Sequence, residues 1–485
     1  MAERAVFYDV SGRRRRRFRL GIVAFVALLL LAGVAFAGTI LAVAPQQQLP
    51  FAVERGTPAA PRTDFLHRSQ RTIRRTARVV SRLWGGAAAD PNKPLAIAFH
   101  APWDDASAAS LQRHIEELDW LIPGWVSITG PDHKVTAFPD TRGRTILAHA
   151  QHRPVLLPMI QNAIEGNWDG AGMAALLHDP AARRTTLDRV EALLQANQAQ
   201  GAFFDFEELP TSAQPDYQRF LAEARARFAR RNWIVAIAVP ADDPDWDLAA
   251  YARVTDKLFL MAYDEHYQGG TPGPIASQRW FEDVVARAQR VVPPDRLIVA
   301  VASYAYAWKA GSTDTDADSV EEAWLAARDS GVMPMFDPAS GDSHFAYDED
   351  GAHHEVWLAD GASVRNEMVA LHRMGVRSIA LWRLGSEDPS LWNFYGRDDP
   401  GLPAAAEIQR IPAGTNVDIE GAGEILRIGA EPVEGRRRIQ TDATGVIVNE
   451  RFDQLPSPYV VERTGWRPKL VALTFDDGPD ATWTP

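Results

Sequence analysis

Eight short apolar segments recur between residues 95 and 382, and amphipathic stretches separate many of them. Most of the segments are almost continuously apolar, as expected for parallel strands that are covered on both faces. One intervening stretch begins with Asp179-Pro180, a pair that favours a helix start, and continues with Leu187, Val190 and Leu194 at helical spacing. This alternation predicts an α/β fold, a (β/α)₈ barrel, although a doubly wound sheet gives a similar pattern. The predicted strands are 95–99, 125–128, 155–160, 202–206, 234–239, 258–263, 297–301 and 378–382.

A basic cluster followed by an uncharged apolar run begins the chain. Residues 1–19 contain seven arginines, and residues 20–44 contain no charged residue. About 20 apolar residues span a bilayer, and flanking arginines stay on the cytoplasmic side. We therefore expect a basic cytoplasmic tail at 1–19 and a single-pass anchor at 20–44 in the inner (cytoplasmic) membrane, with the lipid bilayer as a partner and the later domains outside the cytoplasm. The alternative is a signal peptide cleaved near Ala42-Val43-Ala44.

The composition excludes several classes of function. The chain has no cysteine, so it forms no disulfide, thiol nucleophile or thiolate metal site. A metal site would need His, Asp or Glu. His353-His354 is such a pair, but adjacent residues on a strand face opposite ways. The net charge is −12 in spite of the basic N-terminus, and an acidic body argues against nucleic acid as a partner.

Changes in composition and sequence pattern along the chain predict the domain boundaries. Residues 45–91 are rich in Pro, Ala, Arg and Thr and are predicted to form a linker, with the barrel at 92–400. Residues 401–465 contain period-2 stretches, such as 424–428, so we expect a small β-rich connecting module there. Residues 466–485 hold a new apolar segment, 469–475, which runs into an acidic turn.

Two carboxylates stand at the end of the fourth predicted strand, in the stretch GAFFDFEELP at 201–210. Because side chains alternate along a strand, Phe203, Asp205 and Glu207 share one face. Catalytic groups of such barrels come from the carboxyl ends of strands. Two nearby carboxylates can hold different protonation states, which leaves one as a proton donor near neutral pH, as glycosidic cleavage requires. The alternative is that these acids only cap the next helix.

The same stretch resembles the catalytic strand of the family 18 glycoside hydrolases, the chitinase-like barrels, and in particular their branch of spore peptidoglycan hydrolases. Gly201 and Asp205-Phe206-Glu207 match that pattern. The resemblance covers about residues 93–395. It implies that Glu207 is the proton donor and that Asp205 orients the acetamido group of the substrate. It also implies a retaining reaction in which the substrate's own acetamido oxygen is the nucleophile.

Two further motifs of that family occur in order. Met261-Ala262-Tyr263-Asp264 resembles the motif of the sixth strand, which implies that Tyr263 hydrogen-bonds the reacting acetamido group. Residues 378–382, SIALW, resemble the last strand, which implies that Trp382 forms the floor of the sugar subsite. A hydroxyl and a flat apolar ring are groups that a sugar site needs.

One position departs from the family pattern. Many members carry another acid two residues before the aspartate of D-x-E, where this chain has Phe203, and Gln200 stands where the signature often begins with aspartate. The missing acid removes a charge that would tune the pair of Asp205 and Glu207. The barrel is therefore expected to be a hydrolase, a slower or altered hydrolase, or a binding platform only.

Aromatic residues and a histidine that follow other strands are candidates for glycan contacts. We assign Trp103 and Tyr304 to substrate binding, and His100, Tyr306 and Trp308 occupy similar positions. Ordinary packing at the barrel rim is the alternative for each of them. No cofactor is expected for the barrel.

The end of the chain carries a second family motif. TFDDGP at 474–479 resembles the first motif of the polysaccharide deacetylases of the nodulation-factor deacetylase type. The resemblance implies that Asp476 is the general base and that Asp477 binds a divalent metal, which polarises the acetyl carbonyl and activates water. The two histidine ligands of that family lie downstream, so we expect only the N-terminal edge of the domain at 466–485. Bacterial envelope proteins with this order of parts often continue into a membrane glycosyltransferase.

Taken together, the motifs predict a membrane-anchored protein whose partner is a glycan containing N-acetylglucosamine and whose barrel hydrolyses or remodels that polymer. The alternative is a fragment of a polysaccharide N-deacetylase whose barrel is a non-catalytic glycan-binding module. Chitin oligomers, peptidoglycan and exopolysaccharides all contain the sugar that such a site would use.

Overall fold

The computed structural model describes residues 95–465, apart from residues 131, 165, 314, 350, 397–403 and 415–416. The predicted tail at 1–19, anchor at 20–44 and linker at 45–91 lie outside the described residues. So does the predicted deacetylase edge at 466–485, with Asp476 and Asp477. Between residues 95 and 465, no described helix combines the length and the apolar character needed to cross a bilayer.

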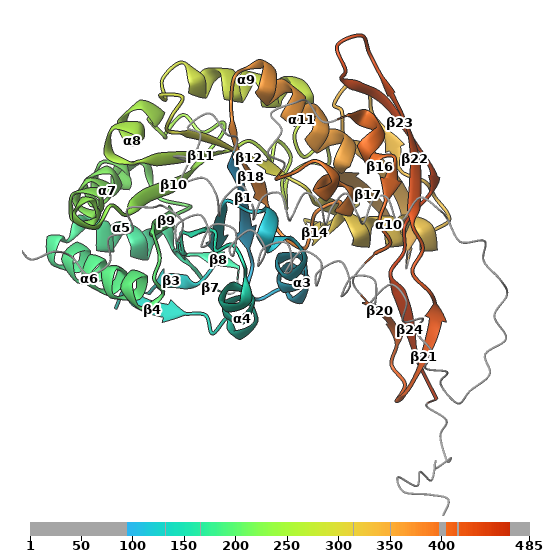
Figure 1. The fold of residues 1–485 in the computed structure, drawn as a ribbon, viewed down its shortest axis with the longest axis horizontal. Helices are drawn as coiled ribbons and strands as arrows, with labels where there is room; N and C mark the ends of the chain where they lie inside the picture. Colours follow the sequence, from blue (N-terminus) through green and yellow to red (C-terminus); the bar gives the residue numbers. More distant parts are fainter. Residues whose placement is uncertain are drawn as a thin grey trace, which may run out of the picture. The chain divides into compact units, whose positions relative to one another are not determined.

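Parallel strands form a barrel at the centre of the fold (Figure 1). Neighbouring strands follow the order β3-β6-β9-β10-β11-β12-β18-β1-β2-β5. Each pairing in this series is parallel, as predicted from the apolar runs. The bounds are β1 Leu95–His100, β2 Trp120–Pro123, β3 Val126–Thr129, β5 Val155–Leu156, β6 Met159–Gln161, β9 Gly201–Asp205, β10 Ile234–Pro240, β11 Lys257–Met261, β12 Leu297–Ala302 and β18 Ser378–Trp382.

The barrel closes because two of its strands are broken into halves. β2 and β3 are consecutive halves of one barrel strand, and β5 and β6 are halves of the next. β2 pairs with β5 and β3 pairs with β6, which joins the two ends of the series. The sequence predicted only 125–128 for the first of these strands and a continuous 155–160 for the second. Pro123 and Pro158 lie at the breaks, where a residue without an amide hydrogen interrupts the ladder.

Helices connect the strands and cover the outside of the barrel (Figure 1). The predicted start of α6 is confirmed, since the Asp179 side chain accepts a hydrogen bond from the Ala181 amide and Pro180 occupies the first turn. The predicted apolar residues Leu187 and Val190 are buried. The helices are α3 Asp105–His114, α4 Thr141–His149, α5 Gly170–His178, α6 Pro180–Ala196, α7 Gln214–Phe228, α8 Leu248–Val254, α9 Gln278–Gln289 and α11 Gly361–Arg373.

An insertion that the sequence reasoning did not predict separates β12 from β18. It contains β13 Ala305–Lys309, β14 Thr315–Asp318, α10 Val320–Asp329, β15 Met335–Phe336, β16 Ser343–Glu349 and β17 Ala352–Leu358. Its strands belong to a second sheet of order β14-β13-β17-β16-β15-β23-β22-β19. Within it, β15 pairs with β23 through Met335 and Arg451, so a strand from after the barrel completes the sheet of the insertion.

Residues 401–465 form strands, as their period-2 pattern predicted, but these strands divide between two sheets. β19 Arg410–Ile411, β22 Gly435–Thr441 and β23 Ile447–Gln454 join the sheet of the insertion. β20 Val417–Gly421, β21 Ile425–Ala430 and β24 Tyr459–Thr464 form a separate three-stranded sheet. Short strands complete the description, namely β4 Lys134–Ala137, β7 Ala163–Ile164 and β8 Asn167–Trp168.

A buried arginine of β22 ties these late strands to the barrel. Arg437 is 2% exposed, and its guanidinium lies 2.9 Å from Asp388 Oδ2 and 3.0 Å from Glu450 Oε1. Asp360 Oδ2 is 3.8 Å away. Asp360 and Asp388 flank α11 and β18 of the barrel, whereas Glu450 belongs to β23. A chain that ended at residue 400 would leave the two aspartates buried without their cation, at a high desolvation cost.

We expect Arg437→Met to lower the free energy of unfolding by about 3–5 kcal/mol, because it leaves three buried carboxylates without a cation. Arg438→Met is the matched control, since the neighbouring side chain is exposed and pairs with Asp453 at the surface. Urea unfolding followed by tryptophan fluorescence measures both variants. Equal unfolding midpoints for the two variants would contradict a structural role of the buried ion pairs.

Candidate active site

The two predicted carboxylates stand at the carboxyl end of β9. Asp205 is the last residue of the strand, and Glu207 follows two residues later. The predicted alternation of faces is present, because Phe203 lies in the inner apolar cluster of the barrel. Phe204 lies in the outer cluster, with its ring centroid 5.2 Å from that of Phe220 on α7. Asp205 shares the side of Phe203, so it faces the barrel interior and is 4% exposed.

Two amides at the end of β6 hold these acids. Gln161 Nε2 donates a hydrogen bond to Asp205 Oδ2 at 3.1 Å. Asn162 fixes the backbone of Glu207, since Asn162 Nδ2 donates to the Glu207 carbonyl and the Glu207 amide donates to Asn162 Oδ1, both at 2.9 Å. Asp205 Oδ1 is buried and accepts no hydrogen bond from a described residue. It is therefore available to accept one from a substrate.

Burial sets the protonation of the pair. Burial raises the pKa of Glu207 well above its usual range, and the charges of Asp205, Asp264 and Glu208 raise it further. Burial also raises the pKa of Asp205, to about 6, against the opposing effect of the hydrogen bond from Gln161. Burial and the three neighbouring negative charges thus favour the protonated form of Glu207, whereas Asp205, with a pKa of about 6, is mostly ionised at neutral pH. This is the division of roles between an acid and a hydrogen-bond acceptor.

Asp264 is the third carboxylate of the site and follows β11. The hydroxyls of Tyr304 and Tyr306 both donate to Asp264 Oδ1, the second at 3.0 Å. Burial raises the pKa of Asp264, and the two tyrosine hydrogen bonds lower it. Because the Tyr304 hydroxyl is engaged by Asp264, only its ring remains for the predicted contact with substrate.

Tyr263 and Trp382 form an aromatic floor beside the carboxylates. Their ring centroids are 6.5 Å apart, and the planes differ by 17°. Burial, and then the charges of Asp264, Asp205 and Glu207, raise the pKa of Tyr263, which reflects its position close to all three acids. The structure thus brings together Asp205, Glu207, Tyr263 and Trp382, which are four of the predicted site residues.

Phe203 occupies the position where the family pattern has another acid. It is 1% exposed, and its ring meets those of Phe99 and Phe259 edge-on, at 5.2 and 4.9 Å between centroids. A carboxylate would be costly among these rings. The neighbour that acts on Asp205 in this chain is therefore Gln161, a neutral donor, and not a second acid.

The remaining candidates divide between the rim and the core. Trp103 is 55% exposed, so its ring is accessible to a glycan. Trp308 is buried. His100 is buried too, and its two ring nitrogens are hydrogen-bonded to Ser107 and Asp140. Of the two alternatives that the sequence left open for His100, ordinary packing is the one the structure shows, because its ring is engaged in the core.

The paired histidines do not form a metal site. His353 is hydrogen-bonded to Asp348, whereas the ring of His354 stacks on that of Tyr347. In the part of the chain that the structure describes, the one group of side chains close enough to share a metal ion contains neither histidine. The predicted metal ligand Asp477 and general base Asp476 lie outside the described residues.

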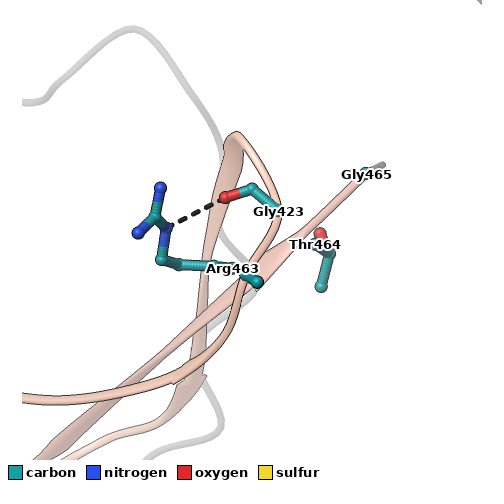
Figure 2. Close-up of a pocket in the computed structure, with 5 residues that line it drawn as sticks. Gly423, Arg463, Thr464 and Gly465 are labelled. Atoms are coloured by element: carbon teal, nitrogen blue, oxygen red, sulfur yellow. Dashed lines mark hydrogen bonds between the residues drawn. The ribbon is translucent and has the colours of Figure 1, made fainter. Parts of the chain in front are cut away.

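Of two hollows in the structure, one adjoins the aromatic floor of the candidate site and the other lies at the three-stranded sheet. One has a volume of about 310 Å³ and is lined by Trp382, Tyr304 and Tyr306, so it adjoins the aromatic floor. The other, of about 370 Å³, lies at the end of the three-stranded sheet, where Arg463 Nε donates to the Gly423 carbonyl at 2.9 Å (Figure 2). No carboxylate lines this second hollow, so it offers no acid for catalysis.

Gln161, Asn162 and Asp264 belong to the site, yet the sequence reasoning assigned none of them a role. All three stand just after predicted strands, 155–160 and 258–263, at the edge of the barrel where active sites are built. Their position was therefore a usable signal. Their hydrogen bonds could not be predicted from the sequence, because these depend on the register between strands.

The sequence and the fold of the chain resemble those of known proteins. Residues 118–388, more than half of the chain, match the profile of the family described as glycosyl hydrolases family 18. Over 267 residues the chain is 26% identical to the cortical fragment-lytic enzyme of Bacillus anthracis, which covers 52% of this chain and 60% of that protein. The enzyme of the same name from Bacillus subtilis is 26% identical over 231 residues, 45% of this chain and 54% of the relative. The chain thus spans little more than half the length of these relatives.

Two solved structures share the fold. The spore cortex-lytic enzyme SleL of Bacillus cereus has a TM-score of 0.55 and 21% identity, over 62% of this chain and 72% of that chain. A chitinase from Chromobacterium violaceum has a TM-score of 0.57 and 22% identity, over 62% of this chain and 96% of that chain. At these identities the likeness shows the barrel fold alone.

We expect Asp264→Asn to lower the pKa of Glu207, because it removes one of the negative charges that favour the protonated form. Carbon-13 NMR of the side-chain carboxyl groups measures this pKa directly. Glu265→Gln, at the next residue, is the control, because its charge is not among those that raise the pKa of Glu207. An unchanged Glu207 titration in Asp264→Asn would show that burial and the charges of Asp205 and Glu208 set the pKa without Asp264.

Proposed function

The chain belongs to glycosyl hydrolase family 18, and from that premise we propose that its barrel hydrolyses glycans that contain N-acetylglucosamine. The observation that supports this most directly is Glu207, a half-buried acid whose pKa is raised by burial and by the charges of Asp205, Asp264 and Glu208, as a proton donor requires. The aromatic floor of Tyr263 and Trp382 lies beside it and offers a flat apolar surface to a sugar ring. The relatives in sequence include cortical fragment-lytic enzymes, and the structures that share the fold include a spore cortex-lytic enzyme and a chitinase.

In the proposed first step, Glu207 gives its proton to the glycosidic oxygen while the bond from that oxygen to C1 breaks. The acetamido oxygen of the same sugar attacks C1, so the substrate supplies its own nucleophile and the intermediate is a cyclic oxazolinium. Asp205, which is ionised and has Oδ1 free of hydrogen bonds within the described residues, accepts the acetamido N–H. We assign the Tyr263 hydroxyl to the stabilisation of the same acetamido group.

In the second step, the Glu207 carboxylate removes a proton from a water molecule as that water attacks C1 from the face that the leaving group occupied. The acetamide re-forms, the configuration at C1 is retained and Glu207 recovers its proton. The positioning of Glu207 depends on Asn162, which holds the backbone of that residue through two hydrogen bonds.

A second candidate function is glycan binding without hydrolysis, and the observation that favours it is Phe203. The acid that many family members carry at this position is replaced by a ring packed against Phe99 and Phe259. In that case the chemistry would belong to the deacetylase domain proposed to begin near residue 466. A membrane anchor at 20–44 would hold either activity outside the cytoplasm, and both parts are proposals from the sequence.

We expect Glu207→Gln to lower the rate of cleavage of chito-oligosaccharides and peptidoglycan fragments by about 10²–10⁴-fold, the usual contribution of a general acid. Mass spectrometry of the products measures cleavage by the purified chain. Glu282→Gln, an exposed glutamate on α9, is the control and should leave the rate unchanged. A chain that binds these glycans in calorimetry but cleaves none of them would support the binding function instead.

We expect kcat/KM to fall as the pH falls through about 6, because protonated Asp205 no longer accepts the acetamido N–H. Gln161→Met should move this acid limb to higher pH, because the hydrogen bond from Gln161 is what lowers the pKa of Asp205. The pH profile of cleavage is the measurement. An acid limb at the same pH in both proteins would assign it to another group.

A further inference from the structure

The hollow of about 310 Å³ adjoins the proposed reaction centre. Its volume is at the lower end of the range for small-molecule sites. Trp382 of the aromatic floor forms part of its wall, together with Tyr304 and Tyr306. The two tyrosines hydrogen-bond Asp264, whose charge in turn raises the pKa of Glu207. A polymer chain lying on Trp382 can therefore continue into this cavity.

The charges that line the cavity are unbalanced. Asp104, Asp318, Glu322 and Arg383 contribute to its wall. Arg383 forms an ion pair with Asp104, so the one cation of the lining is already neutralised. Burial, and then the charges of Glu322 and Asp316, raise the pKa of Asp318 to about 7. Both charges that act on Asp318, those of Glu322 and Asp316, are negative. The cavity therefore holds two carboxylates, Asp318 and Glu322, whose charge no cation of the lining balances.

The insertion fixes these two carboxylates in place. Asp318 is the last residue of β14 and is paired with Ala305 of β13. Ser319 then caps α10, and its amide donates to Glu322 Oε2 at 2.7 Å. Glu322 is thus held through Oε2, while no hydrogen bond within the described residues engages its Oε1, which can accept one from a ligand. Preorganised acceptors of this kind form strong, charge-assisted hydrogen bonds with a cation.

We propose that this cavity is a subsite for a glucosamine unit, whose free 2-ammonium group binds Asp318 and Glu322. The inference rests on the proposed function, in which an N-acetylglucosamine unit lies on Trp382 next to Glu207. An acetylated unit in the cavity would cover two carboxylates without compensating their charge, whereas an ammonium group compensates it. The preferred substrate is then a partially deacetylated polymer, acetylated at the reacting unit and bearing a free amine on the neighbouring unit.

This specificity gives the barrel a place in a reaction sequence. A 2-amino group arises in such a polymer when water cleaves the acetamide and releases acetate, so an N-deacetylation must come before the cleavage by the barrel. The motif at 474–479, which lies outside the described residues, resembles the family that carries out this reaction. Acetyl groups have to survive at the reacting unit, because the proposed mechanism uses their oxygen as the nucleophile.

The test compares binding by the whole chain carrying Glu207→Gln, so that hydrolysis does not enter. The probes are fully acetylated and partially deacetylated chito-oligosaccharides of equal length, measured by calorimetry. We expect tighter binding of the partially deacetylated probe by about tenfold, the value of one charge-assisted hydrogen bond, and a weaker preference at high salt. Adding Asp318→Asn and Glu322→Gln should abolish the preference, so that this variant binds the two probes with equal affinity. Glutamine still completes the helix cap.

Asp348→Asn is the control for the insertion, because this exposed carboxylate lies on β16 and does not line the cavity. Equal binding of the two probes, or a preference that survives in the Asp318 and Glu322 variant, would overturn the proposal. Cleavage by the chain with Glu207 intact is assayed separately on the same probes. A preference in binding without cleavage would refute the proposed hydrolysis and leave the subsite standing, whereas cleavage without a preference would do the reverse.

Discussion

At the mouth of this barrel, carboxylates are withdrawn from solvent without a cation to balance their charge, and this arrangement sets their protonation. Asp205 is buried and Glu207 and Asp264 are half-buried, and the groups that hold them are neutral: the amides at the end of β6 and two tyrosine hydroxyls. An arginine or lysine in their place would stabilise the ionised form of Glu207 and remove its proton. The opposite solution appears around Arg437, where buried acids are paired with a cation and serve the fold. The same residue type thus serves chemistry or stability according to the charge of its neighbour.

The sequence predicted the parts of the structure that local patterns determine. The apolar runs predicted the barrel, and strand alternation predicted the shared face of Phe203, Asp205 and Glu207. Patterns could not predict the insertion between β12 and β18 or the return of β22 and β23 to its sheet, because these depend on pairings between distant residues. The breaks in the second and third strands had a local signal, Pro123 and Pro158, which the prediction did not use. The sequence left two alternatives open for His100, a glycan contact or ordinary packing, and could not decide between them because one of its partners, Asp140, lies forty residues away.

The insertion connects specificity with stability. It carries Tyr306 and Asp318 at the edge of the aromatic floor, and its sheet is completed by β23, which belongs to a later part of the chain. Arg437 then joins β22 and β23 to the segments that flank α11 and β18. The walls of the cavity proposed to receive a glycan are therefore supported by residues that do not line it. Changes in these supports are expected to act on substrate choice through the position of β13 and β14.

The pairing of Met335 with Arg451 has a consequence for how the chain folds. More than a hundred residues must be made after β15 before its partner strand exists, and such long-range pairings form slowly. During synthesis the edge of β15 stays open while the barrel strands already have their neighbours. Open edges of this kind recruit other strands and promote aggregation. The second sheet is therefore complete only when the chain beyond the barrel has been made, and until then the open edge of β15 is exposed to other strands.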